Sequence, residues 1–298
     1  MEPVRIAEPL EEALRSAGLD PADVAWLIGR ALTEDLDSGS DITAEGTIPA
    51  EHRSVVDLVV RGSGVLAGSV VAAAVFDAVS RGACEVELPV ADGEDISHGD
   101  VVLTVEGPTR AIVTAERTAL NILGHLSGVA SLTRQWVVEV RGTGVRVRDT
   151  RKTMPGLRAL EKYAVRCGGG VNHRMGLFDA GLIKDNHAAA AGGVAQAYLA
   201  MKRRFPDTAV QVEVDSLEQL AAVLEVGATS VLLDNFTLDD LMEAVRLSGG
   251  RAELEASGGL SLFSARRVAE TGVSYIAVGA LTHSAPVLDI GADYRREA

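Results

Sequence analysis

The sequence predicts an α/β protein in which a small α+β region precedes an incomplete parallel barrel. Aromatic residues make up only 4% of the 298 residues, so the core must be built from Ala, Val, Leu and Ile. Such a core is typical of strands packed beneath helices. From residue 144 onward, strand-like runs alternate with helical patterns, at residues 145–147, 181–183, 209–214, 230–233, 252–254 and 275–278. Six runs are too few to close an eight-stranded barrel.

The last four of these runs each end in a residue suited to binding. These residues are Glu213, Asp234, Ser257 and Gly279, spaced 21, 23 and 22 positions apart. A repeating strand–helix unit has about this length, and barrel enzymes place their chemistry at the carboxyl ends of parallel strands. The spacing therefore predicts a functional site at this end of the sheet.

The first region combines helical and strand-like patterns. We expect helices at residues 9–18 and 21–36, the second capped by Asp20 with Pro21 in its first turn. A polar loop at 37–46, a strand at 53–60 and a helix at 69–81 should follow. Short strands are expected at 86–88, 101–105 and 112–113, before a long helix that runs from Thr114 to about residue 141. Inside it, Gly124 and Gly128 indicate close packing, either in a crowded interior or at a subunit contact.

Net charge limits the ligands that the chain can bind. At −14, the chain is a poor general binder of nucleic acid or of anionic membranes. Residues 146–174 nevertheless carry eight basic side chains against two acidic ones, a local charge of +6. Within this segment Arg158, Lys162 and Arg166 lie four positions apart, which favours a water-facing helix surface. The remaining basic residues predict an anion site, beside a Gly-Gly-Gly turn that offers open backbone N–H groups.

Other features argue against a secreted, membrane or nucleophilic enzyme. The acidic N-terminal stretch lacks an apolar segment, so we expect no signal peptide. The longest uncharged stretches, at residues 62–76 and 118–133, fall short of the ~20 residues that a membrane helix needs. Cys84 and Cys167 have no metal-binding spacing, which favours reduced thiols in a cytoplasmic protein. No Ser-His-Asp pattern is present.

Several polar residues are better explained by structure than by chemistry. His125 falls inside the long predicted helix, where a packed histidine is the simpler interpretation. Asp35, Asp37 and Asp41 have the composition of a metal loop, but a solvated loop is favoured.

The ordered motifs of the chain resemble the quinolinate phosphoribosyltransferase family. They are EDLDSGSDIT at 34–43, TAERTALNILGHLSG at 114–128, RDTRKTMPGLRALEKYAVRCGGGVNHRMGL at 148–177, LIKDNH at 182–187, VEVDS at 212–216, LLDN at 232–235, EASGGL at 255–260 and AVGALTH at 277–283. A single motif would be weak evidence for the family. All of the motifs, in order and over nearly the whole chain, are strong evidence.

The resemblance implies an N-terminal α/β sandwich domain at residues 1–116 and an incomplete parallel α/β barrel at 117–285. A tail at 286–298 is expected to pack back on the N-terminal domain. It implies a homodimer, or an assembly of dimers, with shared active sites. The implied reaction transfers the phosphoribosyl group of phosphoribosyl pyrophosphate to quinolinate with loss of CO₂, giving nicotinate mononucleotide and pyrophosphate in de novo NAD biosynthesis.

The resemblance also implies the roles of the site residues. Quinolinate would meet Thr150, Arg151, Lys152, His173, Arg174 and Lys184, with Arg117 supplied by the neighbouring chain. Glu213 and Asp234 would face the ribose and Mg²⁺, the latter directly or through its complex with phosphoribosyl pyrophosphate. Together with Lys152 and Lys184 they would be the catalytic residues. The 5′-phosphate would be held by Ser257, Gly258, Gly259, Val278, Gly279 and Ala280.

Three other interpretations stay open on the sequence. One is a related phosphoribosyltransferase that acts on another planar acid, such as the paralogue linked to molybdenum transport. The others are an aldolase-type barrel with Lys184 as a Schiff-base amine, and a non-catalytic phosphate- or nucleotide-binding protein. The Arg151, His173 and Arg174 set suits a substrate with two carboxylates and argues against the first.

Overall fold

The chain forms two compact units in a computed structural model that describes residues 4–37 and 39–295. Unit 1 comprises Met1–Leu132, Met154–Gly169 and Ser284–Ala298, and unit 2 comprises Thr133–Thr153 and Gly170–His283. Helix α5 (Thr109–Glu139) begins in unit 1 and ends in unit 2. It runs through residue 116, where the resemblance puts a domain limit; the limits at 116 and 285 stay predictions.

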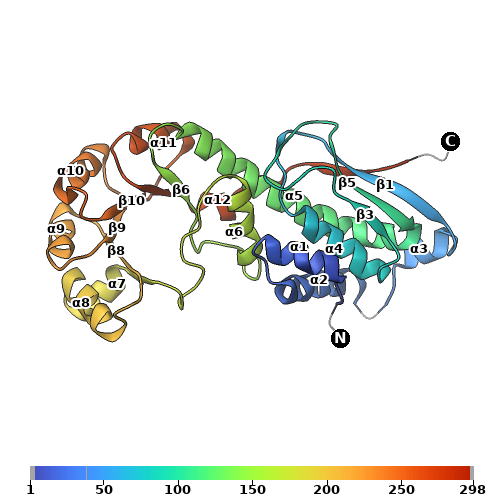
Figure 1. Cartoon of the computed structure of the whole chain (residues 1–298), viewed down its shortest axis with the longest axis horizontal. Helices are drawn as coiled ribbons and strands as arrows, with labels where there is room; N and C mark the ends of the chain where they lie inside the picture. The colour runs from blue at the N-terminus through green and yellow to red at the C-terminus, as the bar shows by residue number, and fades with distance from the viewer. Residues whose placement is uncertain (1–3, 38, 296–298) are drawn as a thin grey trace. The chain divides into compact units, whose positions relative to one another are not determined.

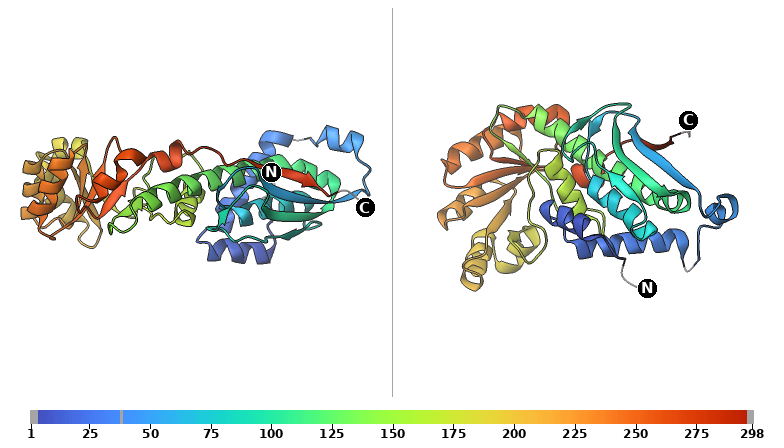
Figure 2. Two further views of the ribbon diagram at one scale, coloured as in Figure 1. Left: turned by 90° about the horizontal axis from the view of Figure 1, so that it is seen from above. Right: turned by 45° about the vertical axis from the view of Figure 1, so that its right-hand side comes forward.

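Unit 1 is built on a four-stranded antiparallel sheet with the order β12-β1-β5-β3. These strands are β1 (Arg53–Val60), β3 (Glu85–Glu87), β5 (Val101–Pro108) and β12 (Ile290–Tyr294). β12 comes from the end of the chain and pairs with β1 from Val56 opposite Tyr294 to Val60 opposite Ile290. Figure 2 shows β12 in red beside the blue β1. Two short strands, β2 (Gly64–Val65) and β4 (Asp95–Ile96), pair separately.

Local sequence signals explain where two of the helices of unit 1 begin, α2 (Pro21–Leu36) and α3 (Ile42–Thr47). The other helices of the unit are α1 (Glu8–Ser16), α4 (Ser69–Ser80), α6 (Arg158–Cys167) and the first part of α5. The Asp20 carboxylate accepts a hydrogen bond from the Ala22 amide, so the predicted cap of α2 is confirmed. Asp41 caps α3 by accepting from the amides of Thr43 and Ala44. The first amides of a helix have no carbonyl partner within the helix, and the cap side chains supply one.

Three sequence expectations for this region are wrong. The polar loop expected at 37–46 contains the start of α3, because Asp41 supplies a cap that the polar composition hid. The strand expected at 112–113 lies inside α5. α5 begins at Thr109 rather than Thr114, directly after Pro108 ends β5. Pro108 has no N–H to continue a ladder, so the chain leaves the sheet there.

Unit 2 is an open, fully parallel sheet covered by helices. Its strand order is β6-β11-β10-β9-β8-β7, and no pairing joins β6 to β7 within the described chain. The strands are β6 (Arg146–Arg148), β7 (Gly181–Ile183), β8 (Val210–Val214), β9 (Ser230–Asp234), β10 (Glu253–Ser257) and β11 (Tyr275–Ala277). The helices are α7 (Asp185–Ala191), α8 (Val194–Arg204), α9 (Leu217–Glu225), α10 (Leu238–Ser248), α11 (Leu262–Ala269) and α12 (Ala280–His283). The predicted incomplete barrel is confirmed.

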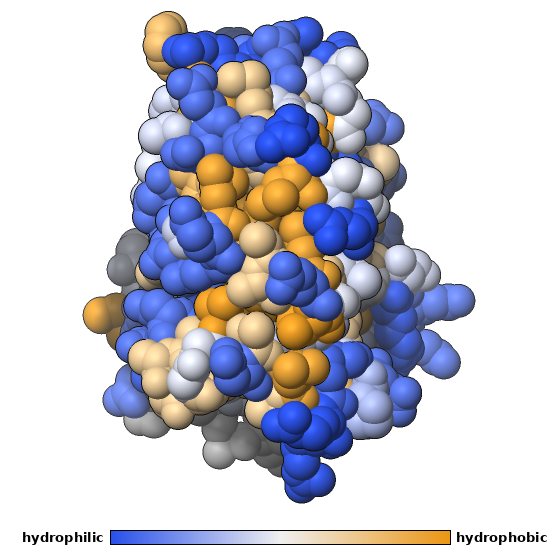
Figure 3. All heavy atoms as spheres, turned by 90° about the vertical axis from the view of Figure 1, so that its left-hand side faces the viewer, coloured by the Kyte–Doolittle hydropathy of each residue, from blue (hydrophilic) through white to orange (hydrophobic). Residues whose placement is uncertain are grey.

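The helices α8 to α11 lie outside the curved sheet, as Figure 1 shows. Their outer face exposes some apolar side chains, among them Leu199 of α8 and Met242 of α10. Figure 3 views this side and shows apolar residues gathered between hydrophilic ones. No helix among the described residues is long and apolar enough to cross a membrane.

Candidate active site

A cavity of about 740 Å³ opens at the carboxyl ends of the unit 2 strands. Alternate residues of two central strands line it, Glu255 and Ser257 of β10 and Leu232 and Asp234 of β9. Successive strand side chains point to opposite faces, so this alternation marks the inner face of the sheet. The register sets Ser257 opposite Asp234, and thus the strand ends reach the cavity at one level.

The cavity gathers almost all of the site residues expected from the sequence. It is lined by Thr150, Arg151, Lys152, His173, Arg174, Lys184, Glu213, Asp234, Ser257, Gly258, Gly259, Val278, Gly279 and Ala280. They come from the ends of all six strands of unit 2 and from the loop after α6. Residues far apart in the sequence therefore meet because parallel strands end at one edge.

Two arginines form the cationic side of the cavity. The Nε atoms of Arg151 and Arg174 are buried and make no hydrogen bond in the described structure. Arg174 donates from Nη1 to the Ala180 carbonyl at 2.9 Å. Burial, and then the positive charge of Arg151, lower the pKa of Arg174 from its usual range. A pair of like charges with unsatisfied buried donors creates a site for an anion.

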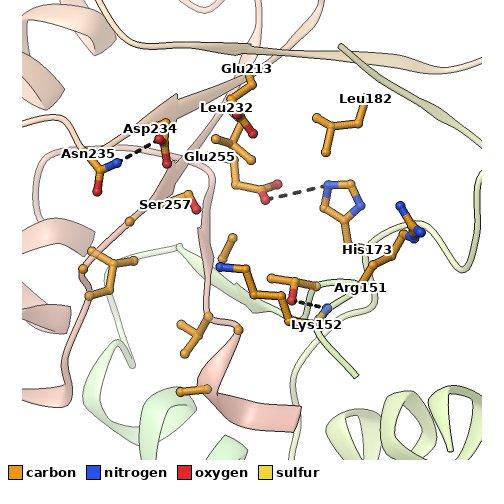
Figure 4. Close-up of a pocket in the computed structure, with 18 of the residues that line it drawn as sticks. Arg151, Lys152, His173, Leu182, Glu213, Leu232, Asp234, Asn235, Glu255 and Ser257 are labelled. Atoms are coloured by element: carbon orange, nitrogen blue, oxygen red, sulfur yellow. Dashed lines mark hydrogen bonds and ion pairs between the residues drawn. The ribbon is translucent and has the colours of Figure 1, made fainter. Parts of the chain in front are cut away.

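The opposite side of the cavity carries two carboxylates. The Glu213 carboxylate accepts from Nζ of Lys184 at 2.5 Å, and the lysine side chain stays 46% exposed. Asp234 accepts from Nδ2 of Asn235 at 2.8 Å. Figure 4 shows Glu213 and Asp234 facing the cavity across from His173 and Arg151. The two arginines therefore lie at one side of the cavity, and the two carboxylates lie at the other, where Lys184 neutralises Glu213.

Gly258 is required by the close approach of two strand ends. A Cβ atom there would lie 2.1 Å from Oδ1 and 2.9 Å from the backbone N of Asn235. Its φ of +95° also lies in the left-handed region, which L side chains avoid. The Asn235 amide bonds the Ser257 carbonyl at 2.9 Å. The glycine thus lets the chain after β10 pass directly over the end of β9.

Matches to family models decide which family the chain is from. The model of the quinolinate phosphoribosyl transferase N-terminal domain matches residues 41–127, and that of its C-terminal domain matches residues 129–293. The chain belongs to the quinolinate phosphoribosyltransferase family.

Individual members of the family are similar along nearly the full chain. A nicotinate-nucleotide pyrophosphorylase (carboxylating) of Mycobacterium leprae is 52% identical over 270 residues, 89% of this chain and 95% of that protein. A quinolinate phosphoribosyltransferase (decarboxylating) of Nicotiana glauca is 38% identical over 287 residues, 90% and 81% of the two chains. The solved nicotinate-nucleotide pyrophosphorylase of Francisella tularensis has a TM-score of 0.88 at 36% identity, covering 92% and 96%. The predicted fold class is confirmed.

Arg117 does not line the cavity. It lies in the third turn of α5, rather than the first turn as expected, because α5 begins earlier. Its side chain is exposed, and no hydrogen bond or ion pair involves it in the described structure. The role that the quinolinate phosphoribosyltransferase resemblance implies for it, in a neighbouring subunit, stays a prediction.

The other residues weighed in the sequence have structural surroundings. Nε2 of His125 lies 2.9 Å from the buried carboxylate of Glu161. Among the described residues, no three or more His, Cys, Asp or Glu side chains are arranged so that they alone could hold a metal ion, and Asp41 is a helix cap. The water-facing row expected at Arg158, Lys162 and Arg166 is wrong, because Lys162 is completely buried. Residue spacing alone does not determine which face of α6 packs inward, because that depends on the elements of unit 1 that pack against the helix.

Sequence reasoning missed a buried polar layer beneath the cavity. It contains Arg148 of β6, Gln211 of β8 and Glu255 of β10, linked by hydrogen bonds of 2.7 and 3.0 Å to one oxygen of Glu255. Glu255 also lines the cavity, as do Leu182, Leu232, Asn235, Leu260, Ala277 and His283. The available signal was the two-residue period, since Gln211 and Glu255 each precede a predicted site residue by two positions.

Proposed function

We propose that this chain transfers the phosphoribosyl group of phosphoribosyl pyrophosphate to quinolinate with loss of CO₂. The products are nicotinate mononucleotide, pyrophosphate and CO₂, and the reaction serves de novo NAD biosynthesis. It is the reaction of the family to which the chain belongs. The same membership argues against an aldolase, and the ion pair of Lys184 with Glu213 also disfavours a free amine at that position.

The arginine pair is the observation that carries the proposal. Arg151 and Arg174 each present a buried, unsatisfied Nε–H beside the cavity. Guanidinium groups bind carboxylates in bidentate fashion, and two of them together favour a ligand with two carboxylates. Quinolinate carries two adjacent carboxylates on its ring, whereas nicotinate carries one. The pair therefore supports quinolinate as the acceptor.

The remaining lining residues suit phosphoribosyl pyrophosphate. The segments Ser257–Gly259 and Val278–Ala280 supply small residues and accessible backbone around the 5′-phosphate. Lys152 and Lys184 act as point charges toward phosphate groups. The carboxylates of Glu213 and Asp234 face the ribose from the strand ends, where positive charge develops during transfer.

The chemistry needs orientation and charge rather than a protein nucleophile. The pyridine nitrogen attacks the anomeric carbon while the bond from that carbon to pyrophosphate breaks. Glu213 and Asp234 stabilise the developing positive charge on the sugar. The bond from ring carbon 2 to its carboxylate then breaks and CO₂ leaves. The electron pair stays on that carbon, stabilised by the positive charge of the adjacent quaternary nitrogen, and the carbon then takes up a proton from solvent. Arg151 and Arg174 hold the acceptor in line for the first step.

The donor set fits Mg²⁺ brought in with the substrate. Glu213 and Asp234 are too few to enclose a six-coordinate ion, and Mg²⁺ usually binds one or two carboxylates together with substrate phosphates and water. These two carboxylates also line a neighbouring cavity of about 710 Å³ with Asp185, Asp215 and Glu218. No cationic side chain is among its described lining residues. Bound there, the ion would neutralise the leaving pyrophosphate.

Changing the two carboxylates tests this part of the proposal. Glu213→Gln and Asp234→Asn should each lower kcat by on the order of 10²-fold, because each removes a charge aimed at the sugar. The Mg²⁺ concentration for half-maximal activity should rise as well. Asp239→Asn, an exposed change on α10, is the control. Unchanged turnover and an unchanged Mg²⁺ titration in both variants would remove them from the site.

A homodimer, or an assembly of dimers, with shared active sites belongs to the same proposal. The exposed Arg117, outside the cavity of its own chain, supports it. A cytoplasmic location is proposed as well. Neither Cys84 nor Cys167 forms a disulfide, which suits a reducing compartment.

One assay tests the central proposal. Pyrophosphate and CO₂ release are measured with phosphoribosyl pyrophosphate and either quinolinate or nicotinate. Quinolinate should be favoured by well over about tenfold in kcat/KM, since nicotinate would leave a buried cation unpaired. Turnover of nicotinate within that factor would sink the assignment. Saturable binding of quinolinate without either product would indicate a binding protein instead.

A further inference from the structure

The imidazole ring of His173 is held on both of its nitrogens. The backbone amide of Arg174 lies 2.7 Å from Nδ1, and Oε1 of Gln211 lies 2.7 Å from Nε2. The backbone is fixed as well, since the His173 amide donates to the buried Asp149 carboxylate at 2.7 Å. The ring is therefore oriented by protein groups before any substrate arrives.

The Arg174 amide, His173, Gln211 and Glu255 form a series of hydrogen bonds, and the groups at its two ends fix the direction of each bond. At one end the Arg174 amide can only donate, so Nδ1 carries no proton. At the other end the Glu255 carboxylate accepts from Arg148 and, at 3.0 Å, from Nε2 of Gln211. The amide oxygen of Gln211 then faces His173 and needs a donor. The donor at Nδ1 and the acceptor at Nε2 therefore both place the ring proton on Nε2.

We propose that Gln211 is a positioning residue, oriented by Glu255, that holds His173 as a neutral imidazole with its proton on Nε2. His173 then presents a ring of fixed orientation to the cavity that it lines. The inference rests on the proposed function, in which Arg151 and Arg174 bind the two carboxylates of quinolinate. Figure 4 shows the ring between Glu255 and Arg151, and its dashed line marks the ion-pair contact of 3.8 Å between Nε2 and Oε1 of Glu255.

The burial of the network explains why its parts depend on each other. Gln211 is 6% exposed, and Glu255 is fully buried with its charge balanced by Arg148. Removing the Gln211 amide leaves Glu255 without one donor and the Nε2–H group of His173 without its acceptor, because Oε1 of Glu255, at 3.8 Å, is beyond hydrogen-bond distance. An unsatisfied buried donor is expensive, so the ring should leave its place to find another partner.

The first test reads the tautomer directly in the full-length wild-type protein without ligand. Nitrogen chemical shifts of ¹⁵N-labelled imidazoles separate protonated from unprotonated ring nitrogens, and a His173→Gln variant identifies the His173 signals among the six histidines. Near neutral pH we expect a protonated Nε2, a bare Nδ1 and a slowly exchanging Nε2 proton. A proton on Nδ1, in either the other tautomer or an imidazolium, would overturn the proposal.

The second test uses Gln211→Leu, with the exposed Gln135→Leu of α5 as a matched control. In Gln211→Leu the slowly exchanging Nε2 proton should disappear. The KM for quinolinate should rise roughly five- to hundredfold, the range expected for an orphaned buried donor. The KM for phosphoribosyl pyrophosphate should stay near the wild-type value. Equal changes in both KM values, or a persisting Nε2 proton, would contradict a positioning role.

The outcomes of these tests distinguish a wrong assignment of His173 from a wrong proposed function. Absence of quinolinate turnover by the wild-type protein would refute the function, while the tautomer measurement would still decide the assignment of His173.

Discussion

At the scale of single residues, the proposed binding of quinolinate depends on the pair Arg151 and Arg174. Arg151→Ala and Arg174→Ala should each lower kcat/KM for quinolinate by the equivalent of roughly 2–5 kcal/mol, the cost of truncating one partner of a desolvated charge contact. Binding of phosphoribosyl pyrophosphate should change much less. Steady-state kinetics with each substrate varied in turn would measure both effects.

The exposed Arg267→Ala of α11 is the control for these variants. It removes the same side chain from a surface outside the cavity and should keep wild-type kinetics. If Arg151→Ala or Arg174→Ala behaves like Arg267→Ala, that arginine is not a substrate contact.

The cysteines give a second prediction at this scale. Burial raises the pKa of the Cys167 thiol to about 11, and burial also raises that of Cys84. The thiolate is the reactive form, and a pKa raised by about two units leaves roughly 100-fold less thiolate at pH 8. Both thiols should therefore react slowly with iodoacetamide in the native protein. Mass spectrometry over time, with the unfolded protein as reference, measures this.

Reactivity should increase as the pH rises toward 11, because the thiols then lose their protons. Native labelling at pH 8 as fast as in the unfolded chain would contradict the prediction. Slow labelling at that pH would also agree with a mechanism that uses no thiol nucleophile.

Individual site residues were predictable where they end a strand. Glu213, Asp234 and Ser257 follow apolar runs, and a parallel sheet brings such positions together. Gln211 and Glu255 were not predictable in the same way. They lie within strands, where a polar residue can face either side, and only the curvature of the open sheet makes their side the interior.

At the scale of elements, the glycines of α5 allow the chain near its end to pass across the helix. A Cβ atom at Gly128 would lie 2.1 Å from the Pro286 carbonyl oxygen, and one at Gly124 would lie 2.8 Å from that of Leu288. The Leu288 amide bonds the Gly124 carbonyl at 3.0 Å. The crowded interior expected for these glycines thus exists within unit 1.

Gly128→Ala should consequently destabilise the protein, by about 1–3 kcal/mol or more, because backbone atoms must move to admit the methyl group. Gly46→Ala in α3 is the matched control, since nothing lies within 4 Å of its added Cβ. That change should be neutral or stabilise by up to about 1 kcal/mol, through helix propensity. Urea unfolding of both variants would compare them. Equal stability of the two would refute the packing argument.

The sequence predicted regular elements better than their ends. The strands of unit 2 were found because apolar runs are bounded by turn residues and separated by amphipathic helices. The start of α5 was missed, since a two-residue apolar run such as 112–113 fits a helix as well as a strand. Only the continuous hydrogen bonding from Thr109 decides between them.

At the scale of the whole molecule, the proposed homodimer predicts that Arg117 completes the active site of a neighbouring subunit. The family models match both parts of the chain, but within one chain Arg117 is absent from the cavity lining. In a two-fold dimer any exchange is reciprocal, so each subunit would supply Arg117 to the other. The alternative is that Arg117 serves only its own chain.

Mixing two inactive variants separates these alternatives. Arg117→Ala and Lys184→Ala should each have little activity, because each lacks one cation of the site. If sites are shared, a mixed dimer has one doubly damaged site and one site with both residues intact. Random exchange makes half the dimers mixed, so about a quarter of wild-type activity should return. If Arg117 acts within its own chain, no site is repaired, and activity stays near zero even after mass spectrometry confirms that subunits have exchanged. That result would refute the shared site, whereas recovery that scales with the fraction of mixed dimers would establish it.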